Sequence, residues 1–203
     1  MIWHLILFLT FLMPEFTEVK VDSDKASLWK VSASSNIKVH GQSNVNEFQC
    51  VTIHYKGDDK LIKKRNGFYN LNELIGTISM DVHSFDCENR IMTRDLRETM
   101  EADAYPNISI SILSLLIPEV IERNGQLLKG KAEITIAGNS QLVDLNWRVI
   151  PENDQKIRLL STRDFSFTQF GLTPPTKMMG MIRVKDKLQV DIDLAIEKIS
   201  EDE

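Results

Sequence analysis

Cysteine and histidine are scarce in this sequence, and their scarcity limits the chemistry that the protein can perform. The chain of 203 residues has two cysteines and four histidines, and no histidine stands at a metal-ligand spacing from another histidine or a carboxylate. The motifs of the serine nucleophile elbow, the phosphate-binding loop and the dinucleotide-binding fold are also missing. We therefore predict no metal site, no cofactor and no catalytic residue, and hence a protein that is not an enzyme.

Positive charge is also in short supply. The chain has 24 Lys and Arg residues against 29 Asp and Glu residues, which gives a formal net charge of −5. The densest basic run is Lys63-Lys64-Arg65, and it lies in a polar segment, residues 57–66, that we predict to be a solvated loop. Proteins that bind nucleic acid present a basic face to the phosphate backbone. We therefore predict that this protein does not bind nucleic acid.

Long apolar runs are missing as well, with one short exception at the N-terminus. Residues 2–13 form an apolar run that is too short to span a bilayer, which takes roughly 20 residues. The run has the length of a signal-peptide core, although no Lys or Arg precedes it and no small-residue cleavage site follows it. We predict a signal peptide or N-terminal hydrophobic segment over residues 1–20, no membrane span in the mature domain, and a periplasmic or secreted protein. An uncleaved anchor and a misplaced start codon are the alternatives.

The two cysteines, Cys50 and Cys87, both fall in segments with the character of strands. In an exported protein two cysteines allow one disulfide, and neighbouring strands supply suitable geometry for it. Two buried free thiols are the alternative, and the sequence leaves both open.

Alternation of apolar and polar residues dominates the chain after residue 25. In residues 73–86, Leu74, Ile78, Met80 and Val82 share one face, while polar side chains occupy the other, as in a half-buried antiparallel strand. Turn residues at 137–140 and 151–154 separate further runs of this kind. The other predicted strands cover residues 28–31, 36–40, 46–55, 107–115, 127–136, 142–149, 157–167, 180–184 and 187–196.

One segment has a helical period instead. Met92, Leu96 and Met100 recur at four-residue spacing among charged residues, which predicts a short amphipathic helix over residues 91–102. Asn89 is placed to cap its N-terminus.

A succession of seven to nine antiparallel strands favours closure into a barrel, because closure removes exposed sheet edges. We predict a mainly β protein with a single antiparallel barrel of about eight strands over residues 26–199, followed by an acidic tail at 200–203. A sandwich would give the same alternation, so the pattern alone leaves that choice open.

Six segments follow one another in a fixed order: residues 29–50, 84–96, 102–106, 128–138, 169–176 and 180–186. In this order they resemble the YceI-like family of lipocalin-like β-barrels. The resemblance spans roughly residues 28–196, nearly all of the predicted domain, and implies the fold just described. In residues 139–141, Asn-Ser-Gln replaces the Thr or Lys that this family usually has before its next strand.

The resemblance implies a barrel whose elongated apolar cavity holds a polyisoprenoid or a related lipid, with the helix near the mouth. Binding of such a ligand, with transport or storage as its purpose, is then the expected function, in a monomer or a homodimer. Two other hypotheses stay open: a ligand-free barrel that acts as a surface interaction module, and a lipid-modifying enzyme on the same scaffold.

The residues predicted to line the cavity lie on apolar faces that are in phase along their strands, and ordinary core packing is the alternative for each. They are Met80, Val82, Ile110, Ile112, Ile134, Ile136, Leu145, Trp147, Phe165 and Phe167. Near the mouth, Asp95 is expected to lie on a solvated helix face or in a salt bridge to the barrel rim. Met178, Met179 and Met181 either gate the mouth or pack under a loop, and we expect packing under a loop.

Overall fold

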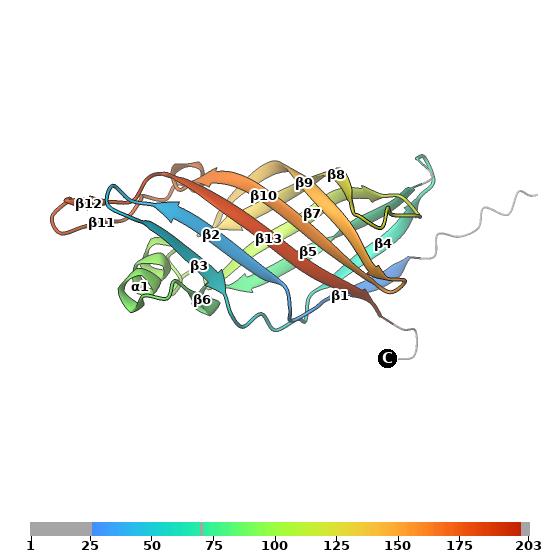
Figure 1. The fold of residues 1–203 in the computed structure, drawn as a ribbon, viewed down its shortest axis with the longest axis horizontal. Coiled ribbons are helices and arrows are strands. Elements are labelled where there is room, and N and C mark those ends of the chain that lie inside the picture. Colours follow the sequence, from blue (N-terminus) through green and yellow to red (C-terminus); the bar gives the residue numbers. More distant parts are fainter. Residues whose placement is uncertain (1–25, 70, 200–203) are drawn as a thin grey trace, which may run out of the picture.

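The chain forms one elongated barrel with a helix at one end (Figure 1), as seen in a computed structural model that describes residues 26–69 and 71–199. The predicted N-terminal segment, residues 1–20, and the acidic tail, residues 200–203, lie outside the described residues. The strands are β1 (Ser27–Val31), β2 (Asn36–Gln42), β3 (Glu47–Thr52), β4 (Lys60–Asn66), β5 (Leu71–Asp81), β6 (Phe85–Asp86), β7 (Asn107–Ile117), β8 (Gln126–Ile136), β9 (Asn139–Asn153), β10 (Lys156–Ser166), β11 (Thr176–Lys177), β12 (Ile182–Arg183) and β13 (Lys187–Lys198). The helices are α1 (Arg90–Thr99) and the short 3-10 turns η1 (Val82–Ser84) and η2 (Thr168–Phe170).

Eight antiparallel strands close the barrel. The order around the ring is β1-β4-β5-β7-β8-β9-β10-β13, and β13 returns to β1 through the pairs Trp29 with Lys198 and Val31 with Ile196. Alternate side chains on every strand of a closed ring point inward, so one apolar core runs along the barrel axis. The predicted fold, a mainly β barrel of about eight strands with a short amphipathic helix, is confirmed.

Strand β13 changes partner along its length. Its last residues pair with β1, but Gln189–Asp193 pair with β2, which continues the sheet through β3 to the short β6. The segment after β3 then lies against β5. There Asp59 accepts hydrogen bonds from the backbone N–H of Ser79 at 2.8 Å and from the hydroxyl of Tyr55 at 2.6 Å. Burial and this carboxylate raise the pKa of Tyr55, so the phenol stays protonated as a donor.

The two ends of the barrel differ. Helix α1 and the β11–β12 hairpin lie at one end, and the β4–β5 turn lies at the other (Figure 1). Large side chains, among them Trp29, Leu61 and Trp147, are buried in the core. Gly130 makes room for the indole of Trp147, since a Cβ at Gly130 would lie 3.1 Å from its ring.

The segment predicted to be a polar loop is in part a strand. Residues 57–59 belong to the connection between β3 and β4, residues 53–59, but Lys63-Lys64-Arg65 lie within β4, which pairs with β1 on one side and β5 on the other. The pattern failed here because Leu61 is buried while basic side chains occupy most of the strand. Lys63 packs over the ring of Trp29, 5.1 Å from its centroid, and burial lowers its pKa. Pairing on both sides, rather than alternation, keeps this segment extended.

Two predicted boundaries also shift. Strand β5 ends at Asp81, so Val82 lies on η1 rather than in the strand. Strand β9 runs through Pro151 to Asn153, which places the turn later than predicted, and the register shifts between Lys156 and Ile157. A proline within a strand removes a ladder hydrogen bond and is tolerated at such irregularities. The predicted turn after β8 is confirmed, with positive φ at Ala137 and Gly138.

Candidate ligand-binding cavity

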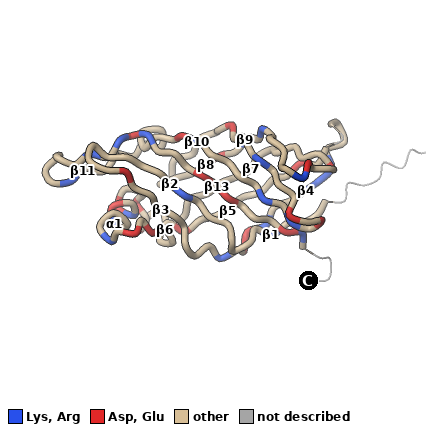
Figure 2. The backbone as a smooth tube through the Cα atoms, viewed as in Figure 1, with Lys and Arg blue, Asp and Glu red and all other residues tan. Residues whose placement is uncertain are grey.

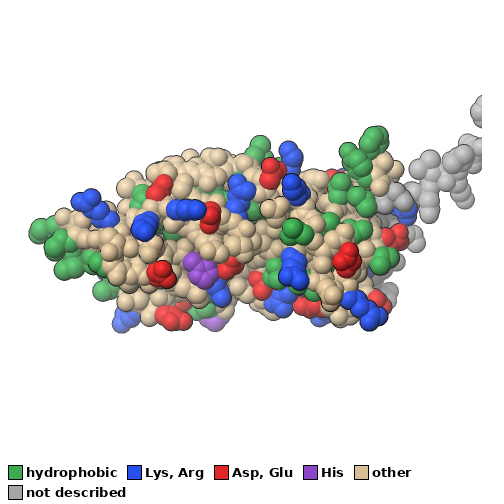
Figure 3. Space-filling model, turned by 45° about the horizontal axis from the view of Figure 1, so that its top comes forward, with side chains coloured by type: hydrophobic (Ala, Val, Ile, Leu, Met, Phe, Trp, Pro, Cys, Tyr) green, Lys and Arg blue, Asp and Glu red, His purple; other side chains and the backbone are tan. Residues whose placement is uncertain are grey.

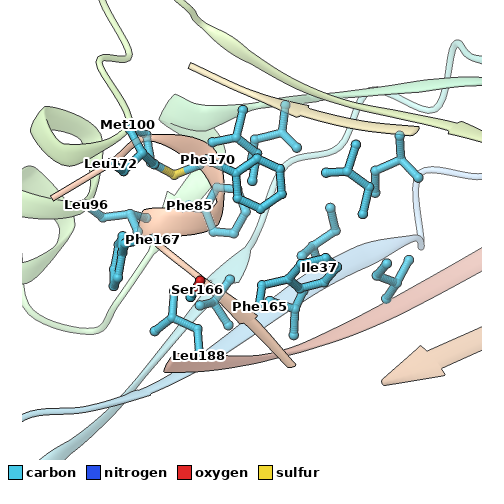
Figure 4. Close-up of a pocket in the computed structure, with 17 residues that line it drawn as sticks. Ile37, Phe85, Leu96, Met100, Phe165, Ser166, Phe167, Phe170, Leu172 and Leu188 are labelled. Carbon is cyan, nitrogen blue, oxygen red and sulfur yellow. The ribbon is translucent and has the colours of Figure 1, made fainter. Parts of the chain in front are cut away.

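An apolar cavity of about 80 Å³ lies inside the barrel at the end that carries α1 (Figure 4). Its walls come from inward positions on β2, β7, β8, β10 and β13, which sequence alternation brings to one face of the sheet. Ser166 is the one polar residue among those that line it. They are Ile37, Val39, Phe85, Leu96, Met100, Ile108, Ile110, Ile134, Ile136, Phe165, Ser166, Phe167, Phe170, Leu172, Leu188, Val190 and Ile192.

Helix α1 and the segment after β10 close one end of this cavity. Leu96 of α1 and Met100, the residue just after the helix, lie on the same side of it as Phe170 and Leu172, as Figure 4 shows. The ring of Phe170 lies 6.0 Å from that of Phe165, a tilted contact that joins this cap to β10.

The start and the end of α1 are set by local hydrogen bonds. The side chain of Asn89 accepts from the N–H groups of Ile91 and Met92, which confirms it as the N-cap. The helix ends at Thr99 rather than at Ala102, and Glu101 then takes a left-handed φ of 51°. A left-handed residue just after the last turn is a common helix stop.

A second, larger hollow of about 280 Å³ lies between α1 and the β11–β12 hairpin. It shares Leu96 and Phe167 with the interior cavity, so these two side chains separate the two spaces. We call this second hollow the groove. It is lined by Ser43, Val45, Asn46, Phe48, Cys50, Asn89, Ile91, Met92, Asp95, Leu96, Thr99, Phe167, Pro175, Lys177, Ile182 and Val184.

An ion pair and a disulfide hold the elements that form the groove. The ammonium of Lys177 on β11 lies 2.7 Å from Oδ1 of Asp95 on α1, so the predicted salt bridge from the helix to the barrel rim is present. A disulfide joins Cys50 on β3 to Cys87, just ahead of α1, and both cysteines are buried. Of the two states that the sequence left open for these cysteines, the structure has the bonded one.

The structure brings half of the predicted cavity residues to the cavity. Ile110, Ile134, Ile136, Phe165 and Phe167 line it. The others are fully or almost fully buried but are not among its lining residues: Met80, Val82, Ile112, Leu145 and Trp147. Ligand contact remains a prediction for the first group, and the second group packs as core.

Other lining residues were missed. Leu188, Val190 and Ile192 on β13 carry the same alternation that singled out β7 and β8, so their pattern was available in the sequence. Phe85 and Phe170 were missed because Phe85 lies on the two-residue strand β6 and Phe170 on the 3-10 turn η2, and the position of such short elements depends on tertiary packing. Among residues 26–69 and 71–199 there is no group of three or more His, Cys, Asp or Glu placed to hold a metal ion. No helix in that part of the chain is long and apolar enough to cross a membrane.

The carboxylate of Asp186, the residue just ahead of β13, anchors η2 at the end of the cavity. Its oxygens accept from the hydroxyl of Thr168 at 2.6 Å and from the Thr168 N–H at 2.9 Å, and these hydrogen bonds hold the pKa of Asp186 below its usual value. A lowered carboxyl pKa adds stability at neutral pH that is lost as the pH falls through the folded-state value.

Thr168→Val is therefore expected to lower the free energy of unfolding at pH 7, by less than about 1 kcal/mol at this partly exposed site. The gap between wild type and variant should narrow as the pH falls below about 4, the ordinary pKa of Asp. Urea unfolding at a series of pH values measures this, with Thr168→Ser as the control that keeps the hydroxyl. A gap that stays constant with pH would contradict the assignment.

The fold and the cavity together define a class of protein, an antiparallel barrel closed around an apolar interior space. Solved structures similar to this chain identify the fold more closely as that of YceI. BcnA of Burkholderia cenocepacia superposes with a TM-score of 0.59 at 14% identity, over 80% of this chain and 96% of that one. A polyisoprenoid-binding domain from Saccharophagus degradans, implicated in plant cell wall breakdown, gives a TM-score of 0.59 at 10% identity, over 84% and 98%.

A mutant of the Campylobacter jejuni YceI protein is similar as well, with a TM-score of 0.51 at 16% identity over 71% of this chain and 82% of that one. No protein-family model and no curated protein matches the sequence. At these identities the similarity establishes the fold, so the chain has the YceI-like fold.

Proposed function

We propose that this protein binds a long-chain apolar molecule, a polyisoprenoid or a related lipid, in the barrel interior. The observation that carries the proposal is the cavity, which lies inside the barrel and is lined almost wholly by hydrocarbon side chains. A hydrocarbon chain transferred there from water gains about 0.8 kcal/mol per CH₂ group. The polyisoprenoid-binding domain of Saccharophagus degradans has the same fold, which supports this choice of ligand class.

The cavity is too small to hold a long ligand by itself. About 80 Å³ is less than the roughly 150 Å³ of an engineered cavity that holds benzene. Ligand pockets usually enclose about 300–1,000 Å³. The ligand would therefore occupy the groove and the cavity together, and Leu96 and Phe167 would move apart to join them. The polar end would remain near the ion pair of Asp95 and Lys177 at the side of the groove.

Binding of this kind needs no catalytic group, so we propose a carrier or store of lipid rather than an enzyme. In a periplasmic or secreted protein, as the N-terminal sequence suggests, a closed barrel would shield an apolar chain from water. The carrier would act as a monomer or a homodimer.

The small volume of the cavity favours one alternative. If Leu96 and Phe167 do not separate, the barrel is filled by its own side chains and serves as a ligand-free interaction module.

Native mass spectrometry of the purified full chain, followed by organic extraction, separates the two functions. A carrier is expected to show a bound hydrocarbon-chain species in near-stoichiometric amount, or to take up a polyprenol such as geranylgeraniol when it is offered. A single apo mass with no uptake would reject the carrier function in favour of the interaction module.

A further inference from the structure

The β11–β12 hairpin projects from the end of the barrel beyond the groove (Figure 1). Its tip turn is closed by hydrogen bonds from Gly180 N–H to the Lys177 carbonyl and from Met181 N–H to the Met178 carbonyl. Met178 and Met179 take left-handed φ values of 52° and 54°, as in the type I′ turns that usually carry Asn or Gly. Methionine is disfavoured at such positions, so the turn conformation does not explain why two methionines stand here. Their apolar side chains are the better explanation.

The hairpin is attached to the barrel through Asn44 of the β2–β3 turn. The Asn44 side chain donates to the Met181 carbonyl at 2.8 Å and accepts from the Arg183 N–H at 2.9 Å, while its own N–H donates to the Arg183 carbonyl. These bonds direct the tip outward. The methionines are consequently exposed: Met178 by 61%, Met181 by 65% and Met179 completely. Our expectation that they pack under a loop was wrong.

Basic side chains follow this apolar tip. Residues 176–187 carry Lys177, Arg183, Lys185 and Lys187 in a chain whose net charge is −5. Lys177 and Lys187 are ion-paired with Asp95 and Asp164, so the excess positive charge near the tip comes from Arg183 and Lys185. Figure 2 shows a basic residue at the hairpin, and Figure 3 shows apolar side chains gathered at the projecting end of the molecule beneath a basic one. Apolar side chains flanked by Lys and Arg are the composition of segments that insert at the interface of an anionic bilayer.

We propose that the tip of the hairpin, defined by Met178, Met179 and Met181 with Arg183 and Lys185, docks the protein on the surface of an anionic lipid bilayer. The methionines would insert among the acyl chains, and the cations would lie at the level of the lipid phosphates. The base of the same hairpin lines the groove through Lys177 and Ile182. Docking therefore brings the groove to the bilayer surface, where an apolar ligand could pass between membrane and barrel without crossing water.

The docking site is inferred from the exposure of the methionines and the charge of the neighbouring residues. Only its purpose, the transfer of a ligand to the groove, rests on the proposed function. The test introduces a local reporter at the tip, Met179→Trp, and a matched one, Phe68→Trp, in the exposed β4–β5 turn at the opposite end of the barrel. Both variants are mixed with vesicles of phosphatidylcholine, alone or with phosphatidylglycerol, that carry brominated acyl chains and no isoprenoid. Trp3, Trp29 and Trp147 are present in wild type and in both variants, so the emission and quenching of each reporter are taken as the difference from wild type under the same conditions. That difference distinguishes hairpin insertion from binding through the N-terminal segment.

With anionic vesicles, Met179→Trp is expected to give a blue-shifted emission that bromine quenches, while Phe68→Trp stays unquenched. Adding Lys185→Gln to Met179→Trp should weaken binding to the anionic vesicles about fivefold, as loss of one cation near a charged surface predicts. Quenching of both reporters, or of neither, would overturn the proposal. Because the vesicles contain no ligand, a failure of docking is distinct from a failure of isoprenoid uptake, which mass spectrometry reports separately.

Discussion

Ile134→Trp is expected to weaken uptake of a long isoprenoid by at least about tenfold while the barrel stays folded. Ile134 is 4% exposed and lines the cavity from β8, so the larger ring would occupy the space that the ligand needs. Excluding only two CH₂ groups of the ligand costs about 1.6 kcal/mol, which already exceeds a factor of ten. Titration with a polyprenol, followed by the quenching of a fluorescent competitor, measures the loss.

The matched control for this variant is Leu142→Trp. Leu142 faces Glu133 across the β8–β9 ladder and is exposed, so it adds the same bulk on the outer surface of the barrel. It is expected to bind the polyprenol like the wild type. Equal affinity of Ile134→Trp and wild type would mean that the ligand does not use the cavity, even if the protein binds lipid elsewhere.

Replacing both Cys50 and Cys87 by Ala is expected to lower the free energy of unfolding by about 4 kcal/mol. The bond closes a loop with a sequence separation of 37 residues, and cross-linking a loop of that length restricts the unfolded chain by about this amount. The folded state also depends on the bond locally, because β3 and β6 share only the pairs Val51 with Asp86 and Thr52 with Phe85. Guanidinium unfolding of the double variant and of wild type measures the difference.

Reduction provides the control for this second variant. A thiol reductant should destabilise wild type by a similar amount and leave the double variant unchanged, since the variant has no bond to lose. A double variant within about 1 kcal/mol of oxidised wild type would contradict the loop-closure estimate.

The elements predicted best from sequence were those with one face in the core. In β8, inward residues such as Ala132 and Ile134 are buried while Lys129 and Lys131 are exposed, so the period of two was visible. In β4 the contrast between buried apolar and exposed polar residues is weak, because the buried Leu61 stands among Lys and Arg residues. What fixes β4 as a strand is its pairing with β1 on one side and β5 on the other. Strand pairing depends on residues far apart in the sequence. Alternation predicts a strand only where one face of that strand is buried and the other is exposed.

The candidate site was likewise predictable in part from the sequence. The inward faces of β7, β8 and β10 were predictable, since alternation alone tells which side chains point to the axis. Whether an inward side chain borders empty space was not predictable. Trp147 and Phe165 both point inward, but only Phe165 borders the cavity.

The sequence by itself determined that this chain is mainly β, that its strands bury one face each, that a short helix begins after Asn89, and that no metal-binding or nucleotide-binding motif is present. The tertiary structure decided how the ring closes through β13, where the interior is hollow, that Cys50 and Cys87 are bonded, and that the methionines at the hairpin tip face solvent. The physical reason is that alternation depends on each residue and its neighbours in the chain. A cavity is the difference between the space that the closed sheet encloses and the volume of the side chains within it, and that difference depends on every strand together.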